Sequence, residues 1–157
     1  MIKILFICHG NICRSPMAEF VLKDMVARRG LKDQFYIASA ATSREEIGNP
    51  VHRGTREKLR EHGISTAGKC AVQLKKSDYE AFDYLLGMEK WNISNIMRII
   101  GTDPDHKVYR LLDFSDRPRD IADPWYTGNF DVTYDDVVEG CEALLAYLEK
   151  NGEIRTR

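Results

Sequence analysis

The chain begins with a nearly unbroken apolar run over residues 1–7, and a polar segment, residues 8–15, follows it at once. Lys3 is the one charged residue in the run. Runs of this kind are typical of strands covered on both faces, as in parallel sheets. Such a strand needs neighbouring strands and two covering layers, so the rest of the chain has to supply both.

Strand and helix patterns then alternate to the end of the chain. We expect further strands at 35–38, 82–86 and 107–111, and helices at 50–62, 91–100 and 132–150. Ser15 and Pro16 are expected to open a first helix as N-cap and first helical residue, and Gly30 to close it. Residues 113–130 are expected to form a long loop. This order predicts an α/β fold: three α/β/α layers with a central four-stranded parallel sheet flanked by helices.

A length of 157 residues suits one domain, so we expect a single domain over 1–157. The net charge of -1 gives no reason to expect nucleic acid or a membrane surface as partner, and we expect neither. No targeting segment or membrane span is apparent. Four cysteines without a CxxC pair favour reduced thiols and a cytoplasmic location, and suggest no metal. We expect no cofactor.

The segment Cys8-His-Gly-Asn-Ile-Cys-Arg14-Ser15 lies between the first strand and the first helix, where open parallel sheets bind ligands. A loop that enters a helix N-terminus directs backbone N–H groups to one point, which suits a phosphate dianion. Cys8 would supply a thiolate, Arg14 a planar fork for two phosphate oxygens, and Ser15 a hydroxyl hydrogen bond to the thiolate. Gly10 and Asn11 tolerate a left-handed backbone and would let the loop curl. The other loop residues expected at the phosphate are His9, Ile12 and Cys13.

The spacing alone is a weak signal, because a cysteine followed six positions later by an arginine also arises by chance. The alternative is a buried cysteine at a strand end beside a surface arginine. Cys8 is nevertheless the only one of the four cysteines with this spacing, and its strand–loop–helix setting favours the phosphate site.

The long loop contains candidates for a general acid. A phenolate leaves more easily when a carboxylic acid protonates it. Composition does not choose among the loop aspartates, which are Asp113, Asp116, Asp120 and Asp123. Trp125 and Tyr126 would flank a slot for an aromatic ring, or alternatively would pack the loop onto the core.

The segments CxGNICRSPMAE (8–19) and DPWY (123–126) resemble the low-molecular-weight protein tyrosine phosphatases. The likeness continues in SAATS (39–43), IGNP (47–50), HGI (62–64) and FDY (82–84). It implies a metal-independent hydrolase that acts on phosphotyrosine in proteins or peptides through a phosphocysteine, releases inorganic phosphate and acts as a monomer. The roles implied by the resemblance are nucleophile for Cys8, phosphate binding for Arg14, support of the thiolate for Ser15, bracing of the loop for Asn11 and Ser39, general acid for Asp123, and a reversible disulfide with Cys8 for Cys13.

Three positions depart from the pattern of these relatives. His9 replaces an apolar residue, and would either add polarity at the rim of the slot or point to water. Glu45 replaces an aromatic wall residue, which would disfavour acidic peptides. Relatives also carry a second histidine shortly after HGI, but this chain has none between His62 and His106, so that brace of the loop is missing or replaced.

Rival functions share parts of this pattern. Arsenate reductases need a closely spaced downstream cysteine pair, whereas Cys70 and Cys141 are far apart and are expected to be structural. Phosphoarginine phosphatases of the same family carry threonine where this chain has Ile12. A phosphate-binding module without activity would not need a nucleophile, a clamp and an acid together.

Overall fold

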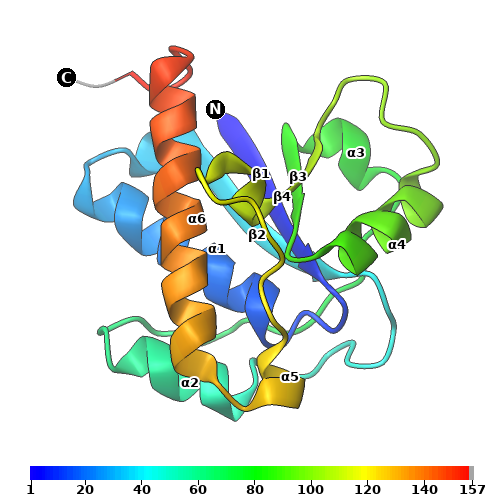
Figure 1. Ribbon diagram of the computed structural model, residues 1–157, viewed down its shortest axis with the longest axis vertical. Helices are drawn as coiled ribbons and strands as arrows, with labels where there is room; N and C mark the ends of the chain where they lie inside the picture. The colour runs from blue at the N-terminus through cyan, green and yellow to red at the C-terminus, as the bar shows by residue number, and fades with distance from the viewer. Residues whose placement is uncertain (156–157) are drawn as a thin grey trace.

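The computed structural model describes residues 1–155 and contains one parallel sheet with helices on both sides (Figure 1). Along the chain the elements are β1 (Ile2–Cys8), α1 (Arg14–Arg28), β2 (Phe35–Ala41), α2 (Arg53–Arg60), α3 (Asp78–Ala81), β3 (Tyr84–Gly87), α4 (Lys90–Ile100), β4 (Val108–Arg110), α5 (Pro124–Thr127) and α6 (Phe130–Lys150), with 3-10 helices at Lys32–Gln34 and Leu111–Phe114. The sheet order is β2-β1-β3-β4, and every pairing is parallel. The predicted α/β architecture is confirmed.

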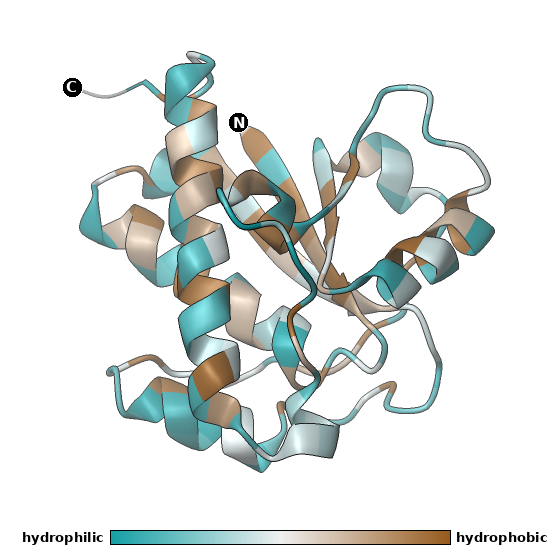
Figure 2. Cartoon of the chain, in the orientation of Figure 1, coloured by the Kyte–Doolittle hydropathy of each residue, from teal (hydrophilic) through white to brown (hydrophobic). Residues whose placement is uncertain are grey.

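The alternating side chains of β1 build two cores. Ile4 and Phe6 pack with α1 and α6 on one face of the sheet. Leu5 and Ile7 pack on the other face with side chains of α4, such as Ile96. Figure 1 shows these helices on opposite sides of the sheet, and Figure 2 shows the hydrophobic residues concentrated on the strands and on the inward faces of the helices. β1 is therefore covered on both sides, as its apolar run predicts.

Helix boundaries differ from the sequence prediction, and two of the differences have a clear local cause. α1 begins at Arg14 with Cys13 at the N-cap, so the prediction of Ser15 as N-cap is wrong. The helix predicted at 50–62 is limited to Arg53–Arg60, because Pro50 pairs with Cys70 in an isolated bridge and Gly63 adopts a φ of 73°.

Two short helices lie where the sequence predicted none. α3 ends at Ala81, with Phe82 as its C-cap, and β3 begins only at Tyr84. α5 lies inside the segment predicted as a loop, with Asp123 as its N-cap and Pro124 as its first residue. Each has four residues, which is too short for a recognisable helical period.

The segment before α5 is fixed to the sheet and to α6 by named contacts. Ile121 is fully buried, and its N–H donates to the carbonyl of Met88 at 2.8 Å. Asp120 accepts from the backbone N–H of Lys90 at 3.0 Å, and Arg119 pairs with α6. These contacts bring Asp123 to the carboxyl ends of β1 and β3.

None of the helices formed by residues 1–155 combines the length and the apolar character that crossing a bilayer requires.

Candidate active site

A cavity of about 490 Å³ opens at the carboxyl end of β1, beside the N-terminus of α1. Of the residues predicted for the site, those that line it are Cys8, His9, Gly10, Ile12, Cys13, Arg14, Asp123, Trp125 and Tyr126. Three residues outside that prediction also line it, namely Glu45, Glu46 and Trp91. The structure thus gathers side chains from distant parts of the chain around one hollow.

The predicted supporting residues lie behind the loop rather than in the cavity. The sulfur of Cys8 is 3.0 Å from the hydroxyl of Ser15. Asn11 Nδ2 donates to Ser15 Oγ at 2.8 Å and to Ser39 Oγ at 2.9 Å. These contacts explain why Ser15 does not cap α1, because its hydroxyl is hydrogen-bonded to the Cys8 sulfur and to the Asn11 amide instead.

The loop curls at Asn11 rather than at Gly10. Asn11 has a φ of 58°, the left-handed region that asparagine tolerates, and its Oδ1 accepts from the N–H of Val72 at 3.1 Å. Gly10 does not use a positive φ. Of the two residues expected to tolerate a left-handed backbone, only Asn11 adopts it.

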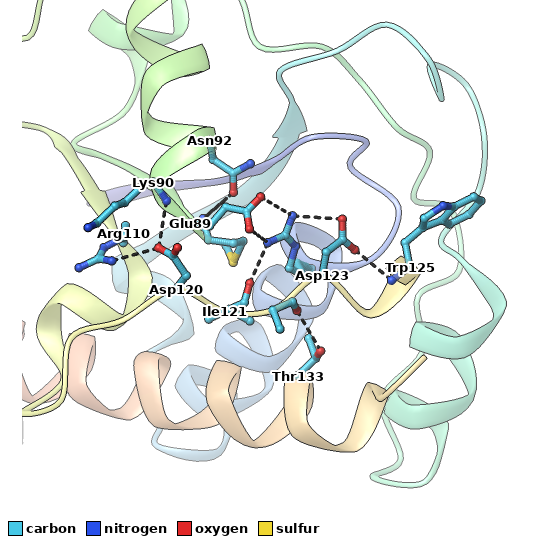
Figure 3. Close-up of polar contacts among 12 residues, drawn as sticks. Glu89, Lys90, Asn92, Arg110, Asp120, Ile121, Asp123, Trp125 and Thr133 are labelled. Carbon is cyan, nitrogen blue, oxygen red and sulfur yellow. Dashed lines mark hydrogen bonds and ion pairs between the residues drawn. The ribbon is translucent and has the colours of Figure 1, made fainter. Parts of the chain in front are cut away.

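Arg14 is 1% exposed, and its guanidinium is held from three sides. Nη1 donates to the carbonyl of Ile121 at 2.8 Å and lies 3.1 Å from Glu89 Oε2. Nη2 lies 3.3 Å from Asp123 Oδ2. Figure 3 shows the side chains of Glu89 and Asp123 pointing toward one another. Burial opposes the charge, but Cys8, Glu89 and Asp123 together raise the pKa of Arg14, so it stays a cation.

Among the four candidate aspartates, Asp123 is the one that lines the cavity. Its Oδ1 accepts from the N–H of Trp125 at 3.0 Å, which fixes the carboxylate at the start of α5. Asp113 and Asp120 instead pair with Arg110, and Asp116 is exposed.

The mouth of the cavity combines aromatic and acidic side chains. His9 Nε2 lies 2.9 Å from Glu45 Oε2, and its ring stacks on Trp91 with centroids 5.0 Å apart. His9 therefore contributes polarity at the rim, one of its two expected roles. Trp125 and Tyr126 are 57% and 84% exposed, so neither is packed into the core.

Sequence reasoning missed Glu89, Trp91 and Lys69. Glu89 follows β3 and shares a capping box with Asn92, a pattern that a search for helix starts would have found. Trp91 was predicted only as the start of a helix. Lys69 Nζ donates to the carbonyl of Ser39 at 2.9 Å, so a lysine lies against the loop support in the segment where a histidine was expected to be missing or replaced.

The four cysteines are free thiols. Cys13 is buried beside Cys8, and burial, with the charges of Cys8 and Asp123, raises its pKa to about 12. Cys141 is fully buried in α6, as a structural residue should be, whereas Cys70 is exposed. Within residues 1–155, no three His, Cys, Asp or Glu side chains are grouped so that they could hold a metal ion.

Comparison with known proteins gives a consistent result. A family model described as low molecular weight phosphotyrosine protein phosphatase matches residues 3–154. The low molecular weight protein-tyrosine-phosphatase YfkJ of Bacillus subtilis is 41% identical over 98% of this chain and 100% of its own length. The crystal structure of YfkJ has a TM-score of 0.90, with 96% of each chain covered.

A structural neighbour of lower sequence identity is an arginine phosphatase by name. The crystal structure of DARP, drosophila arginine phosphatase, has a TM-score of 0.87 and is 28% identical, covering 94% of this chain and 98% of that one. It shares the fold at lower sequence identity than YfkJ.

Proposed function

The chain belongs to the low molecular weight phosphotyrosine protein phosphatase family, and we propose that Cys8, Arg14 and Asp123 carry out its reaction. The protein is a protein tyrosine phosphatase, a metal-independent hydrolase that acts on phosphoproteins through a phosphocysteine, as is typical of the family. The comparisons do not favour the arginine phosphatase or arsenate reductase alternatives. The assignment of individual residues is our proposal.

The proposed reaction has two steps. The Cys8 thiolate attacks phosphorus in line, and the bond to the tyrosine oxygen breaks while Asp123 gives that oxygen its proton. The Asp123 carboxylate then takes a proton from water, which attacks the phosphocysteine and releases inorganic phosphate and the thiolate. Phosphoryl transfer mainly requires positioning and charge stabilisation, which Arg14 and the N–H groups of residues 9–14 would provide.

One observation carries this assignment: Cys8, Arg14 and Asp123 line one cavity, with the Ser15 hydroxyl 3.0 Å from the sulfur. The Ser15 hydroxyl would stabilise the thiolate as it attacks and as it leaves.

The finer identity of the partners is part of the proposal. Phosphotyrosine would enter between the exposed rings of Trp91, Trp125 and Tyr126, with His9, Gly10, Ile12 and Cys13 around its phosphate. The protein is proposed to act as a single-domain monomer in the cytoplasm, without nucleic acid or membrane as partner, since a net charge of -1 gives no general attraction to either. Residues 156 and 157 of the expected domain lie outside the described residues.

The test is hydrolysis of para-nitrophenyl phosphate by the whole chain, with and without a chelator. Cys8→Ser should abolish turnover and retain phosphate binding, whereas Cys70→Ser, at an exposed thiol outside the cavity, should leave turnover unchanged. Residual activity in Cys8→Ser, or loss of activity with the chelator, would contradict the covalent mechanism.

A further inference from the structure

His52 begins α2 with a ring rather than with a short polar side chain. It is the N-cap of this helix, and its Nδ1 accepts from the backbone N–H of Gly54 at 3.0 Å. The usual N-cap residues are serine, threonine, asparagine and aspartate, which supply the acceptor from a small side chain. A histidine at this place caps the helix and also presents an aromatic surface to its neighbours.

The His52 ring packs on the ring of Phe130. The two rings are nearly parallel, with their centroids 5.4 Å apart and an angle of 13° between the planes. Phe130 is held close to α2, because any side chain at Gly54 would overlap its ring. Phe130 also packs against the buried cluster that contains Ile12 and Cys13. The stack and the helix cap together fix the orientation of the His52 ring.

The same imidazole meets the indole of Trp125 edge to face. Their centroids are 5.5 Å apart and their planes lie at 73°, a favoured arrangement of two rings. Trp125 belongs to the four-residue helix α5 and is 57% exposed. Among residues 1–155, His52 provides the only ring that pairs with this indole. Trp125 lines the cavity, so His52 supports one wall of the cavity from behind.

The backbone of His52 makes a separate contact with the loop that lines the cavity. Its N–H donates to the carbonyl of Ile12 at 2.8 Å. Figure 1 shows α2 beside α5 and the start of α6, in agreement with the two ring contacts. The backbone bond is retained when the side chain at position 52 is changed, so the role of the ring can be tested by itself.

We propose that His52 is a positioning residue that holds the Trp125 indole in place as a wall of the cavity and so sets the selectivity for aryl phosphates. The indole in turn limits the space that a substrate ring can occupy above the bound phosphate. The inference rests on the proposed function, because it takes phosphotyrosine as the group that enters. Within residues 1–155, α2 contributes no side chain to the cavity lining, yet it acquires a part in substrate selection.

The test separates the ring of His52 from its helix cap. His52→Asn keeps an acceptor at the N-cap and removes the ring, whereas His52→Phe keeps a ring and removes the acceptor. His62→Asn is the matched control, because His62 stacks on Tyr134 with centroids 4.2 Å apart, outside the cavity. The measurements are KM and kcat for a phosphotyrosine peptide, and the inhibition constant of inorganic phosphate, which has no ring.

For His52→Asn we expect KM for the peptide to rise by about twofold to tenfold, the effect of one aromatic pair, while kcat and the phosphate inhibition constant stay unchanged. His52→Phe should keep the wild-type KM and lower the urea midpoint, because it loses the cap. His62→Asn should leave all three kinetic quantities unchanged. Added to Trp125→Ala, His52→Asn should raise KM no further, because its effect passes through the indole.

Fluorescence reports on the indole directly. The chain has two tryptophans, so Trp125 is the single reporter in a Trp91→Phe background. His52→Asn should increase the quenching of its emission by acrylamide, and His52→Phe should not. A purely structural role of His52 would lower stability without changing KM or the quenching of the folded protein.

A folded His52→Asn protein with an unchanged KM would overturn the proposal. A lower kcat, or an equal weakening of phosphate binding, would also overturn it, because the histidine would then act on Asp123 or on the loop rather than on the wall. If His52→Asn does not fold, His52→Ser, another residue that caps helices, decides the matter by the same measurements. Failure of the wild-type protein to hydrolyse aryl phosphate would instead refute the proposed function, which keeps the two failures apart.

Discussion

Arg14 and Glu89 form a largely buried ion pair, with Nη1 of the arginine 3.1 Å from Oε2 of the glutamate. The side chain of Arg14 is 2% exposed and that of Glu89 is 23% exposed. Glu89 is itself fixed, because it is the N-cap of α4 in a capping box with Asn92. The proposed phosphate clamp is therefore oriented by a residue from outside the phosphate loop, at the carboxyl end of the neighbouring strand (Figure 3).

This relationship predicts a catalytic role for the charge of Glu89. Glu89→Gln keeps the shape and a hydrogen-bond acceptor for the helix cap but leaves a buried guanidinium poorly compensated. We expect kcat/KM for para-nitrophenyl phosphate to fall by about tenfold, and the free energy of unfolding in urea to fall by about 1–3 kcal/mol. Glu57→Gln, at the exposed pair with Arg53, is the control and should change neither quantity. A stability loss with unchanged kcat/KM would mean that Glu89 only supports the fold.

A second prediction concerns the proton given to the leaving group. Asp123→Ala should lower kcat for phosphotyrosine by about a hundredfold or more, because a phenolate of high basicity needs the acid. Turnover of 2,4-dinitrophenyl phosphate, whose leaving group needs no proton, should fall much less. Asp116→Ala, at an exposed position of the same segment, should leave both rates unchanged. Equal slowing of both substrates by Asp123→Ala would assign the acid to another residue.

The sheet was predictable from the sequence because its signals are local. The apolar run that becomes β1 and the amphipathic period of α6 each lie within one short window. Helices α3 and α5 were missed because four residues give no period. Ser15 was misplaced as an N-cap because its tertiary partner, the sulfur of Cys8, outweighs the local preference of serine for helix starts.

The site was predictable to the extent that it is contiguous. Residues 8–15 form one loop, so their spacing and setting indicate a phosphate site. Glu89 is 75 positions from Arg14 along the chain, and no local pattern connects the two. Lys69 and Ser39 are likewise 30 positions apart, and only the folding of the chain brings them into contact. Asp123 could be chosen among four aspartates only by resemblance, because the sequence does not show which one the contacts of Ile121 and Asp120 bring to the cavity.

The buried thiol of Cys13 predicts how disulfide formation depends on pH. Peroxide would convert the Cys8 thiolate to a sulfenic acid, and the Cys13 thiolate would then attack that sulfur and release hydroxide. Because burial, the largest cause, raises the pKa of Cys13, its thiolate fraction, and so the rate of this second step, should rise about tenfold per pH unit between pH 7 and 9. The measurement is stopped-flow oxidation with mass spectrometry, with Cys13→Ser as the variant that should stop at the sulfenic acid. A pH-independent second step would mean that Cys13 does not attack as the thiolate.

The acidic mouth of the cavity predicts a preference among phosphopeptides. Glu45 and Glu46 both line the cavity, and the side chain of Glu45 is 70% exposed. We expect a peptide with lysine beside the phosphotyrosine to have a higher kcat/KM than the matched peptide with glutamate. Glu45→Gln, which can still form a hydrogen bond with His9, should reduce the ratio of kcat/KM for the lysine peptide to kcat/KM for the glutamate peptide by about twofold to fivefold. High salt should reduce the same ratio. Glu61→Gln, at an exposed site outside the cavity, should leave it unchanged. If Glu45→Gln does not alter the ratio, the mouth does not select by charge.

The attachment of the acid segment to α6 predicts a change of stability with pH. Arg119 lies 2.9 Å from Glu139 and 2.8 Å from Asp136, and Ser115 also donates to Glu139. The hydrogen bonds from Arg119 and then Ser115 lower the pKa of Glu139 from 4.5 to about 2. The folded-state value lies below the unfolded one, so this contribution is complete above about pH 4.5 and is lost as the pH falls toward 2. Glu139 is 32% exposed, so screening by solvent limits the contribution to about 1 kcal/mol.

Arg119→Gln should lower the free energy of unfolding in urea by about that amount at pH 7 and by progressively less from pH 4.5 to pH 3. Arg117→Gln, whose side chain is 73% exposed and lies 3.6 Å from Glu139, should have a much smaller effect. A difference between wild type and Arg119→Gln that does not change with pH would show that the arginine stabilises the segment by packing rather than through the ionised carboxylate.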